Sequence, residues 1–303
     1  MDQEFLKQLC RIVGNEHVYT KEPMRKHTTF RIGGPADYYL IPHCQEEVGQ
    51  IIAACREAGM PYYILGNGSN LLVGDRGYRG VIIQLFKNFD KLSVEGTVLT
   101  AKAGVLLSRL ARQALASDLT GLEFAAGIPG TLGGAVVMNA GAYGGEMKDV
   151  LERVTVLTPT GEILELAREE LELGYRTSVI SRKNYIVLEA KLLLHAGDHK
   201  VIAERMEELK EQRTAKQPLE YPSAGSTFKR PAGHFAGQLI MEAGLAGFSV
   251  GDAQVSAKHC GFVINSGQAT AAEVIALMSE VSRRVEEKFG VALEPEVKML
   301  GEF

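Results

Sequence analysis

One uncharged, glycine-rich stretch constrains this chain more than any other feature. Residues 124–145 read FAAGIPGTLGGAVVMNAGAYGG and hold seven glycines and no charged side chain in 22 residues. Glycine is placed where a backbone turns sharply, takes a positive φ or approaches another group closely. The stretch is too rich in glycine for an ordinary helix and too apolar for an ordinary loop. We therefore interpret it as backbone wrapped around a large, partly anionic ligand.

Two plainer interpretations of this stretch exist: a buried loop and a membrane-spanning helix, for which its length is suitable. Pro129, Asn139 and the density of glycine argue against a spanning helix.

Composition excludes several classes of protein. The 303 residues are enough for a substantial core divided into two or three units. Acids and bases are interspersed and the net charge is −4, which gives no electrostatic footprint for nucleic acid. The N-terminus carries acids and no long apolar run, so it does not resemble a signal peptide. The four scattered cysteines show no metal-like spacing and predict reduced thiols in a cytoplasmic protein without a metal site: Cys10, Cys44, Cys55 and Cys260.

Apolar periodicity predicts the main helices and strands. Helices are expected at 4–13, 45–58, 107–118, 199–213, 234–243 and 271–289. Strands are expected at 27–42, 61–65, 71–73, 81–85, 185–197, 261–265 and 297–300, with hairpins turning at 95–96 and 160–161. Thr270 and Glu273 form a capping box before the last helix, which Gly290 ends.

A second glycine-rich loop lies between two of the expected strands. Residues 66–70 read GNGSN, and their backbone and side-chain donors suit a pyrophosphate in a tight turn. The loop is not a Rossmann fingerprint, because strand rather than helix follows it, and no Lys-Ser/Thr pair makes it a Walker loop. Considered alone, the loop also fits a plain β-turn that binds no ligand. Together with residues 124–145, about sixty residues away, it indicates a long, flat, diphosphate-bearing cofactor.

Residues 214–231 form the third unusual segment, which we expect to lack regular structure. So long a loop in a compact domain is usually functional. It places Ser226 near Lys229 and Arg230, where a hydroxyl donates a proton to a developing carbanion or binds phosphate. The plainer interpretation is a solvated loop with capping serines. Arg176 lies in a YRTS sequence before a strand, and Glu296 lies before the last strand. Their positions alone predict only surface ion-pair partners. The seven histidines show no catalytic spacing.

Six sequence motifs occur in an order that resembles one known family. HTTFRIGGPAD, ILGNGSNLLV, GIPGTLGGAVVMNAGAYGGE, YRTS, YPSAGSTFKRP and LEPEVK cover the chain from about residue 20 to its end. The chain resembles the UDP-N-acetylenolpyruvoylglucosamine reductases, flavoenzymes of peptidoglycan precursor synthesis. The short interval between Arg176 and Ser226 resembles the subtype without an insertion in the third domain. Lys298 stands where the family often has Arg, and it keeps the charge.

The resemblance implies an α+β fold with a non-Rossmann, PCMH-type FAD-binding region. It implies an N-terminal helix at 1–20, FAD-binding subdomains at 21–88 and 89–197, and a substrate-binding domain at 198–303. The expected FAD contacts come from both glycine-rich segments: Gly66, Asn67, Gly68, Ser69, Asn70, Gly127, Ile128, Pro129, Gly130, Gly133, Gly134, Asn139, Gly141 and Ala142.

The resemblance also implies the chemistry. NADPH is the reductant, and a UDP-sugar enolpyruvyl ether is the substrate. Arg176 would bind the carboxylate of the enolpyruvyl group and Glu296, in its protonated form, would assist, because donors placed beforehand best meet charge that develops in the transition state. Ser226 would protonate the second carbon. Further substrate contacts are expected from Tyr175, Arg213, Lys216, Lys229 and Arg230, and Lys229, Arg230 or an ordered water would stabilise the serine alkoxide.

Two other functions remain open at this stage. One is a different PCMH-type flavoprotein that oxidises an alcohol or a sugar, although no His or Cys for covalent flavin attachment lies inside the glycine-rich segments. The other is a catalytically silent flavin-binding module. In each case we expect a monomer with no membrane span and no nucleic-acid partner.

Overall fold

The computed structural model describes residues 2–303, which divide into two compact units. Unit 1 comprises residues 2–19, 39–67 and 81–213, and unit 2 comprises residues 20–38, 68–80 and 214–303. Four of the five points of division lie in strands β1 (Val18–Pro23), β2 (Pro35–Leu40) and β5 (Tyr78–Gln84) and in helix α6 (His199–Lys216). The fifth lies between residues 67 and 68, in the loop before β4 (Leu71–Val73). Strands β1, β2 and β5 form a four-stranded sheet with β3 (Tyr62–Leu65), in the order β1-β2-β5-β3.

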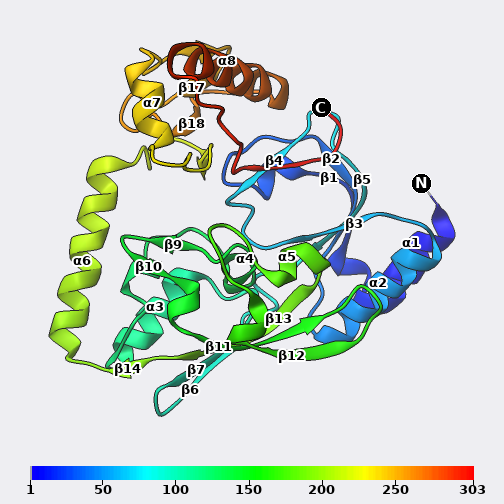
Figure 1. The fold of residues 1–303 in the computed structure, drawn as a ribbon. Helices are drawn as coiled ribbons and strands as arrows, with labels where there is room; N and C mark the ends of the chain where they lie inside the picture. Colours follow the sequence, from blue (N-terminus) through cyan, green and yellow to red (C-terminus); the bar gives the residue numbers. More distant parts are fainter. Residues whose placement is uncertain (1) are drawn as a thin grey trace. The chain divides into compact units, whose positions relative to one another are not determined.

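Unit 1 is built on a five-stranded antiparallel sheet (Figure 1). Its strands, in the order β12-β11-β13-β7-β6, are Ile163–Ala167, Leu151–Leu157, Ile186–Leu193, Val98–Lys102 and Leu92–Glu95. Helices α1 (Gln3–Val13) and α2 (Gln45–Glu57) pack on each other, and α3 (Leu107–Ala116) packs on the short strand β8 (Leu119–Thr120). The remaining short elements are α5 (Val179–Lys183), β9 (Gly141–Ala142), β10 (Gly145–Glu146) and β14 (His195–Ala196).

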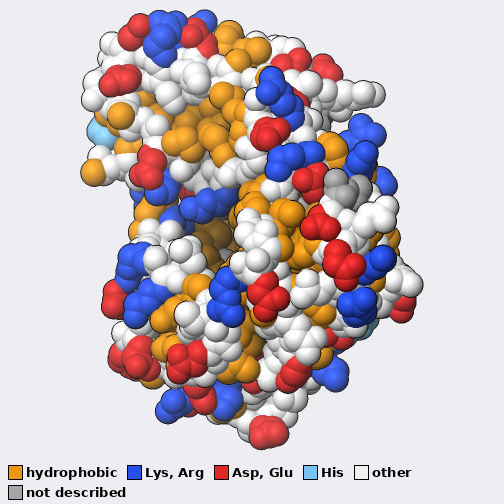
Figure 2. Space-filling model, turned by 90° about the vertical axis from the view of Figure 1, so that its right-hand side faces the viewer, with side chains coloured by type: hydrophobic (Ala, Val, Ile, Leu, Met, Phe, Trp, Pro, Cys, Tyr) orange, Lys and Arg blue, Asp and Glu red, His pale blue; other side chains and the backbone are white. Residues whose placement is uncertain are grey.

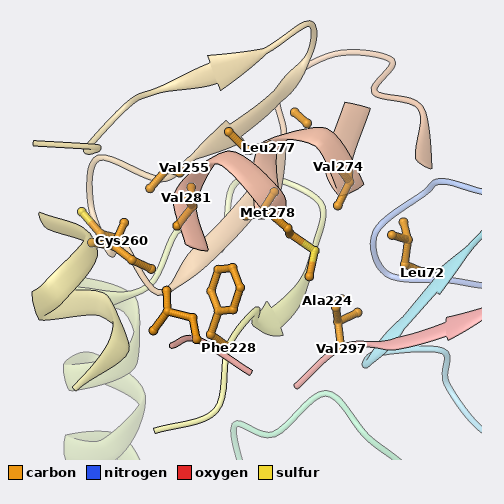
Figure 3. Close-up of a cluster of buried hydrophobic side chains, with 14 of the residues drawn as sticks. Leu72, Ala224, Phe228, Val255, Cys260, Val274, Leu277, Met278, Val281 and Val297 are labelled. Atoms are coloured by element: carbon orange, nitrogen blue, oxygen red, sulfur yellow. The ribbon is translucent and has the colours of Figure 1, made fainter. Parts of the chain in front are cut away.

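Unit 2 is a small sheet covered by two helices. The sheet order is β15-β18-β17-β16, with bounds Ser223–Ser226, Phe262–Asn265, Ala253–Val255 and Ser249–Val250. Helices α7 (Ala236–Glu242) and α8 (Ala271–Phe289) contribute much of the core, in which Phe228, Met278 and Val281 lie in one cluster (Figure 3). Strand β19 (Lys298–Leu300) pairs in parallel with β4 (Leu71–Val73).

Most predicted elements are confirmed to within a few residues. Helix α8 has the predicted bounds, the Thr270–Glu273 capping box and a left-handed Gly290 at φ 67°. Both predicted hairpins are present, as β6–β7 and β11–β12. The α+β class predicted from the sequence is confirmed. No helix in residues 2–303 is long and apolar enough to cross a membrane.

Three predictions about local structure are wrong. Segment 27–34 is not strand, because Arg31 (φ 57°) and Gly33 (φ 136°) leave the extended region and a Cβ at Gly34 would lie 2.2 Å from the carbonyl oxygen of Asp75. Segment 214–231 is not structureless, because α6 continues to Lys216 and β15 forms at Ser223. The glycine-rich stretch contains a helix, α4 (Leu132–Val137), which packs on β13 and β7 (Figure 1).

Helix α4 forms despite its two glycines because packing outweighs intrinsic propensity. A Cβ at Gly133 would lie 2.9 Å from the Cβ of Ala103, so only glycine lets this helix approach the segment after β7. Its other buried residues, Leu132, Ala135 and Val136, are apolar and contribute to the core. Helix α5 and strand β1 were not predicted, because each is short and carries polar residues at most positions.

Candidate functional site

The start of the 66–70 loop lies against the 124–145 segment in unit 1. The Nδ2 of Asn67 donates a hydrogen bond of 2.6 Å to the carbonyl oxygen of Pro129. A Cβ at Gly66 would lie 2.3 Å from the Oγ1 of Thr131, so glycine is required for this approach. The two segments that the sequence analysis considered together are therefore in contact in the structure.

Several glycines of residues 124–145 are required by packing inside unit 1. A Cβ would lie within 3 Å of a neighbour at Gly127 (Arg213 Cδ), Gly133 (Ala103 Cβ), Gly141 (Gly145 O) and Gly145 (the Phe124 ring). Gly134 is exposed, and its nearest such contact, the Thr131 Oγ1, is 3.7 Å away. The glycines thus serve the folding of the segment as well as any ligand that it holds.

The donors in these segments suit an anionic dinucleotide. Neither segment contains a carboxylate, and both offer backbone N–H groups, amides and hydroxyls. The residues predicted to bind FAD divide between the units: Gly66, Asn67, Gly127, Ile128, Pro129, Gly130, Gly133, Gly134, Asn139, Gly141 and Ala142 lie in unit 1, and Gly68, Ser69 and Asn70 lie in unit 2. Within residues 2–303, no group of His, Cys, Asp or Glu side chains is arranged to hold a metal ion.

Gly68 packs against the HTTF sequence in unit 2. A Cβ on Gly68, which has a φ of 63°, would lie 2.1 Å from the carbonyl oxygen of His27. The N–H of Thr29 donates to the Gly68 carbonyl oxygen at 3.1 Å, and the Thr29 hydroxyl donates to the carbonyl oxygen of Ser223 at 2.7 Å. Thr29 therefore joins the glycine loop to β15, which ends at Ser226.

Arg176 occupies the corner of a tight turn in unit 1. Gly174 and Thr177 exchange backbone hydrogen bonds of 3.1 and 3.3 Å around Tyr175 and Arg176. Arg176 has a φ of 55°, a left-handed conformation that non-glycine residues rarely take. Its guanidinium carbon lies 5.1 Å from the centre of the exposed Tyr175 ring. The YRTS sequence precedes helix α5 rather than a strand.

A β-bulge places the side chain of Ser226 on the exposed face of its strand. Ser223 pairs with Ile264 and Ser226 with Phe262, so β15 has one more residue than β18 between the two pairs. Gly225 takes a φ of 77° at this point. Regular alternation would place Ser226 on the same face as Ala224 and Phe228, which are buried, whereas the bulge leaves Ser226 exposed.

Glu296 lies on a segment that runs beside the one carrying Ser226. The N–H of Glu296 donates to the Thr227 carbonyl oxygen at 2.8 Å, and Phe228 pairs with Pro295 in an antiparallel bridge. The Nδ2 of Asn70 donates to the Glu296 carbonyl oxygen at 3.3 Å. Unit 2 thus brings together the ends of three motifs that are far apart in the sequence.

The predicted substrate-binding cations differ in their surroundings. Arg213 packs on Gly127 in unit 1, and burial lowers the pKa of its guanidinium. Lys216 is the exposed last residue of α6. Lys229 forms an ion pair with Glu294, and the guanidinium carbon of Arg230 lies 4.4 Å from the centre of the Phe235 ring. On the face in Figure 2, basic and acidic side chains are interspersed.

Sequence reasoning missed the buried hydroxyls that hold these segments. Thr227 is buried, its N–H donates to Gly261 at 2.8 Å, and its Oγ1 accepts the Val263 N–H at 2.9 Å. Ser178 and Thr131 are also buried. The partners of Thr227 and Ser178 lie 36 and 41 residues away along the chain, so no local sequence signal marked these hydroxyls.

Comparison with known proteins agrees with this arrangement. Residues 36–167 match the FAD binding domain family, which together with the α+β fold defines a flavin-binding protein. Residues 217–300 match the family described as UDP-N-acetylenolpyruvoylglucosamine reductase, C-terminal domain.

Full-length relatives identify the family. The UDP-N-acetylenolpyruvoylglucosamine reductase of Lachnoclostridium phytofermentans is 54% identical over 306 residues, which cover 100% of this chain and 99% of that protein. That of Alkaliphilus metalliredigens is 50% identical over 303 residues, covering 100% of each chain. The crystal structure of the reductase from Thermus caldophilus is 39% identical, with a TM-score of 0.80 over 93% of this chain and 98% of that one. The chain belongs to the UDP-N-acetylenolpyruvoylglucosamine reductase family.

Proposed function

We propose that this protein is an FAD-containing, NADPH-dependent oxidoreductase that reduces UDP-N-acetylglucosamine enolpyruvate to UDP-N-acetylmuramate for peptidoglycan synthesis in the cytoplasm. The observation that carries the proposal is the antiparallel pairing of the Ser226 and Glu296 segments in a member of this family. The two glycine-rich segments, which contact each other and contain no carboxylate, support FAD as the cofactor. We retain as proposals a monomeric state, FAD-binding subdomains at 21–88 and 89–197, and a substrate domain at 198–303.

In the proposed reaction the carbon–carbon double bond of the enolpyruvyl ether gains two hydrogens and becomes a lactyl ether. The two glycine-rich segments would hold FAD, which would supply hydride, drawn from NADPH, to the terminal carbon. Negative charge then builds up on the second carbon and its carboxylate. We assign Arg176 to that carboxylate, because a guanidinium presents a fixed fork of donors to two oxygens. We assign Glu296, as a second hydrogen-bonding group, to the same developing charge.

Ser226 is the proposed donor of the second hydrogen, as a proton. The bulge at Gly225 leaves the hydroxyl exposed and therefore accessible to a ligand. An alkoxide forms as the proton leaves, and a neighbouring donor must stabilise it. The candidates for this role are Lys229, whose ammonium group pairs with Glu294, Arg230 and an ordered water.

Anaerobic spectroscopy tests the proposed function. The purified protein should be yellow, NADPH should bleach the flavin, and UDP-N-acetylglucosamine enolpyruvate should restore the colour without oxygen. UDP-N-acetylglucosamine, which lacks the enolpyruvyl group, is the matched control and should restore nothing.

Three outcomes would overturn the proposal. Restoration by oxygen alone after reduction by an alcohol or a sugar would identify an oxidase. A flavin that NADPH does not bleach would identify a silent binding module. If both sugar nucleotides restored the flavin colour equally, the enolpyruvyl group would not be the electron acceptor and the assigned substrate would be wrong.

A further inference from the structure

Two hydrogen bonds tie the Arg176 turn to the C-terminal end of helix α4. On one side, the Nδ2 of Asn139 donates to the carbonyl oxygen of Gly174 at 3.1 Å. On the other side, the Oγ of Ser178 donates to the carbonyl oxygen of Val137 at 2.6 Å. The two bonds involve the first residue of the four-residue turn that carries Arg176 and the residue immediately after that turn.

The amide of Asn139 is fully engaged with protein groups. Its Nδ2 also donates to the Oε2 of Glu146 at 2.8 Å, and its Oδ1 accepts the N–H of Lys148 at 2.9 Å. An asparagine amide has two N–H donors, and both are used here, one by the carbonyl oxygen of Gly174 and one by the carboxylate of Glu146. The side chain is 1% exposed, so its contacts lie inside unit 1.

The turn is of a kind that needs external support. Arg176 takes a φ of 55°, and residues in this region persist where the surroundings over-determine the backbone. Asn139 is itself left-handed at φ 46°, which asparagine tolerates better than most residues. Ser178 is fully buried and also caps helix α5, which follows the turn.

Charge links Asn139 to the guanidinium as well. A hydrogen bond from Lys148, assisted by the one from Asn139 and by the positive charge of Arg176, lowers the pKa of Glu146. Asn139 therefore holds both the backbone of the arginine turn and a carboxylate that experiences the charge of the arginine.

We propose that Asn139 and Ser178 are positioning residues that fix the Arg176 turn to the glycine-rich segment, so that the guanidinium is preset for the carboxylate of the substrate. The inference rests on the proposed function, because it takes Arg176 to bind that carboxylate. It assigns the Asn139 amide, which the resemblance predicts as an FAD contact, to substrate geometry instead, because its donors and its acceptor are engaged with protein groups.

The variant Asn139→Gly tests this role in the holoenzyme. Glycine accepts the left-handed backbone and removes the whole side chain, including the amide. The matched control is Asn184→Gly, the same change at an exposed residue with a φ of 54° at the end of helix α5. Flavin content, the rate of reduction by NADPH, the rate of anaerobic reoxidation by the enolpyruvyl substrate, and amide hydrogen exchange at Thr177 are measured.

We expect Asn139→Gly to keep its flavin and its rate of reduction, and to be reoxidised roughly 10- to 100-fold more slowly, since a misplaced positioning group costs factors of this size. Exchange at the Thr177 amide should become faster. In an Arg176→Ala background, Asn139→Gly should slow reoxidation no further, because its effect passes through the arginine. Ser178→Ala should reproduce the pattern from the other side of the turn, and Asn184→Gly should match the parent.

Several results would overturn the inference. One is loss of flavin from Asn139→Gly while Thr177 exchange stays unchanged. Another is an equal slowing by Asn139→Gly with and without Arg176. If Asn139→Gly does not fold, Ser178→Ala decides by the same criteria. If the parent protein is not reoxidised by the substrate at all, the proposed function fails, while Thr177 exchange still reports whether Asn139 holds the turn.

Discussion

The backbone N–H of Glu296 donates a 2.8 Å hydrogen bond to the carbonyl oxygen of Thr227, the residue that follows Ser226. The proposed proton donor and the proposed acid are therefore held on adjacent segments by main-chain bonding. Thr227 is in turn fixed to Gly261 and Val263 through its own N–H and hydroxyl. A substitution at Ser226 should consequently change the chemistry without moving the segments.

Ser226→Ala should separate the two halves of the reaction. Flavin reduction by NADPH should keep the rate of the parent, while anaerobic reoxidation by the enolpyruvyl substrate should fall by about 10²- to 10⁴-fold, the range expected for loss of a general acid. Stopped-flow absorbance of the flavin measures both rates. Ser223→Ala, in the same strand, is the control, because the contact with Thr29 uses the Ser223 carbonyl and survives the change. An equal fall in both half-reactions would contradict the role of Ser226.

Gly225→Ala should disturb the bulge that exposes Ser226. A Cβ at this position meets nothing within 4 Å, so the cost is the left-handed backbone itself, about 1–2 kcal/mol of the free energy of unfolding. Gly244→Ala is a matched control, with a φ of 76° and equally open space. Urea denaturation should show a similar loss in both variants. Only Gly225→Ala should also slow flavin reoxidation, and equal activity in the two would argue against a functional bulge.

The glycine-rich segment shows how much of the structure can be predicted from the sequence. Its composition marks the segment as unusual, and the contact from Asn67 to Pro129 confirms that it lies beside residues 66–70. Helix α4 was not foreseen, because it depends on the approach of Gly133 to Ala103, thirty positions earlier in the chain. Local propensity holds no information about such a contact.

The candidate site in unit 2 also depends on contacts that local sequence does not predict. The resemblance predicted Ser226 and Glu296 as partners, but no periodicity indicated a bulge at Gly225 or a strand at Ser223. Both depend on pairing with β18, nearly forty residues later in the chain. By contrast, the bounds of α8 were predictable because the Thr270 capping box and Gly290 are local signals.

Asp75→Ala should destabilise the protein through helix α8. The Asp75 carboxylate accepts the N–H groups of Ala271 and Ala272 at 2.8 and 2.9 Å, which are the first two of the helix. Loss of a cap of this kind costs about 0.5–2 kcal/mol. The control is Asp37→Ala, which removes a partly exposed ion pair with Arg79 worth about 0–1 kcal/mol. Thermal or urea unfolding should rank Asp75→Ala as the more destabilising, and a reversed ranking would show that the cap is not used.

His259 should make the stability of the protein fall in mild acid. Burial lowers the pKa of its imidazole below the ordinary value of 6.5, so the folded protein holds the ring neutral. The neutral Nδ1 accepts the N–H of Gly261 at 3.2 Å, a bond that protonation removes. The unfolded chain binds a proton near pH 6.5 and the folded chain only at lower pH. This contribution is therefore fully present above pH 6.5 and is lost as the pH falls from there toward the lowered pKa.

Urea unfolding between pH 5 and 8 measures this effect of His259. His259→Gln should show a flatter dependence on pH across that window than the parent. His234→Gln, at an exposed histidine of unit 2, should follow the parent. A parent whose stability rises as the pH falls from 7 to 5, or a His259→Gln variant with the same slope as the parent, would contradict the assignment of the acid sensitivity to this half-buried ring.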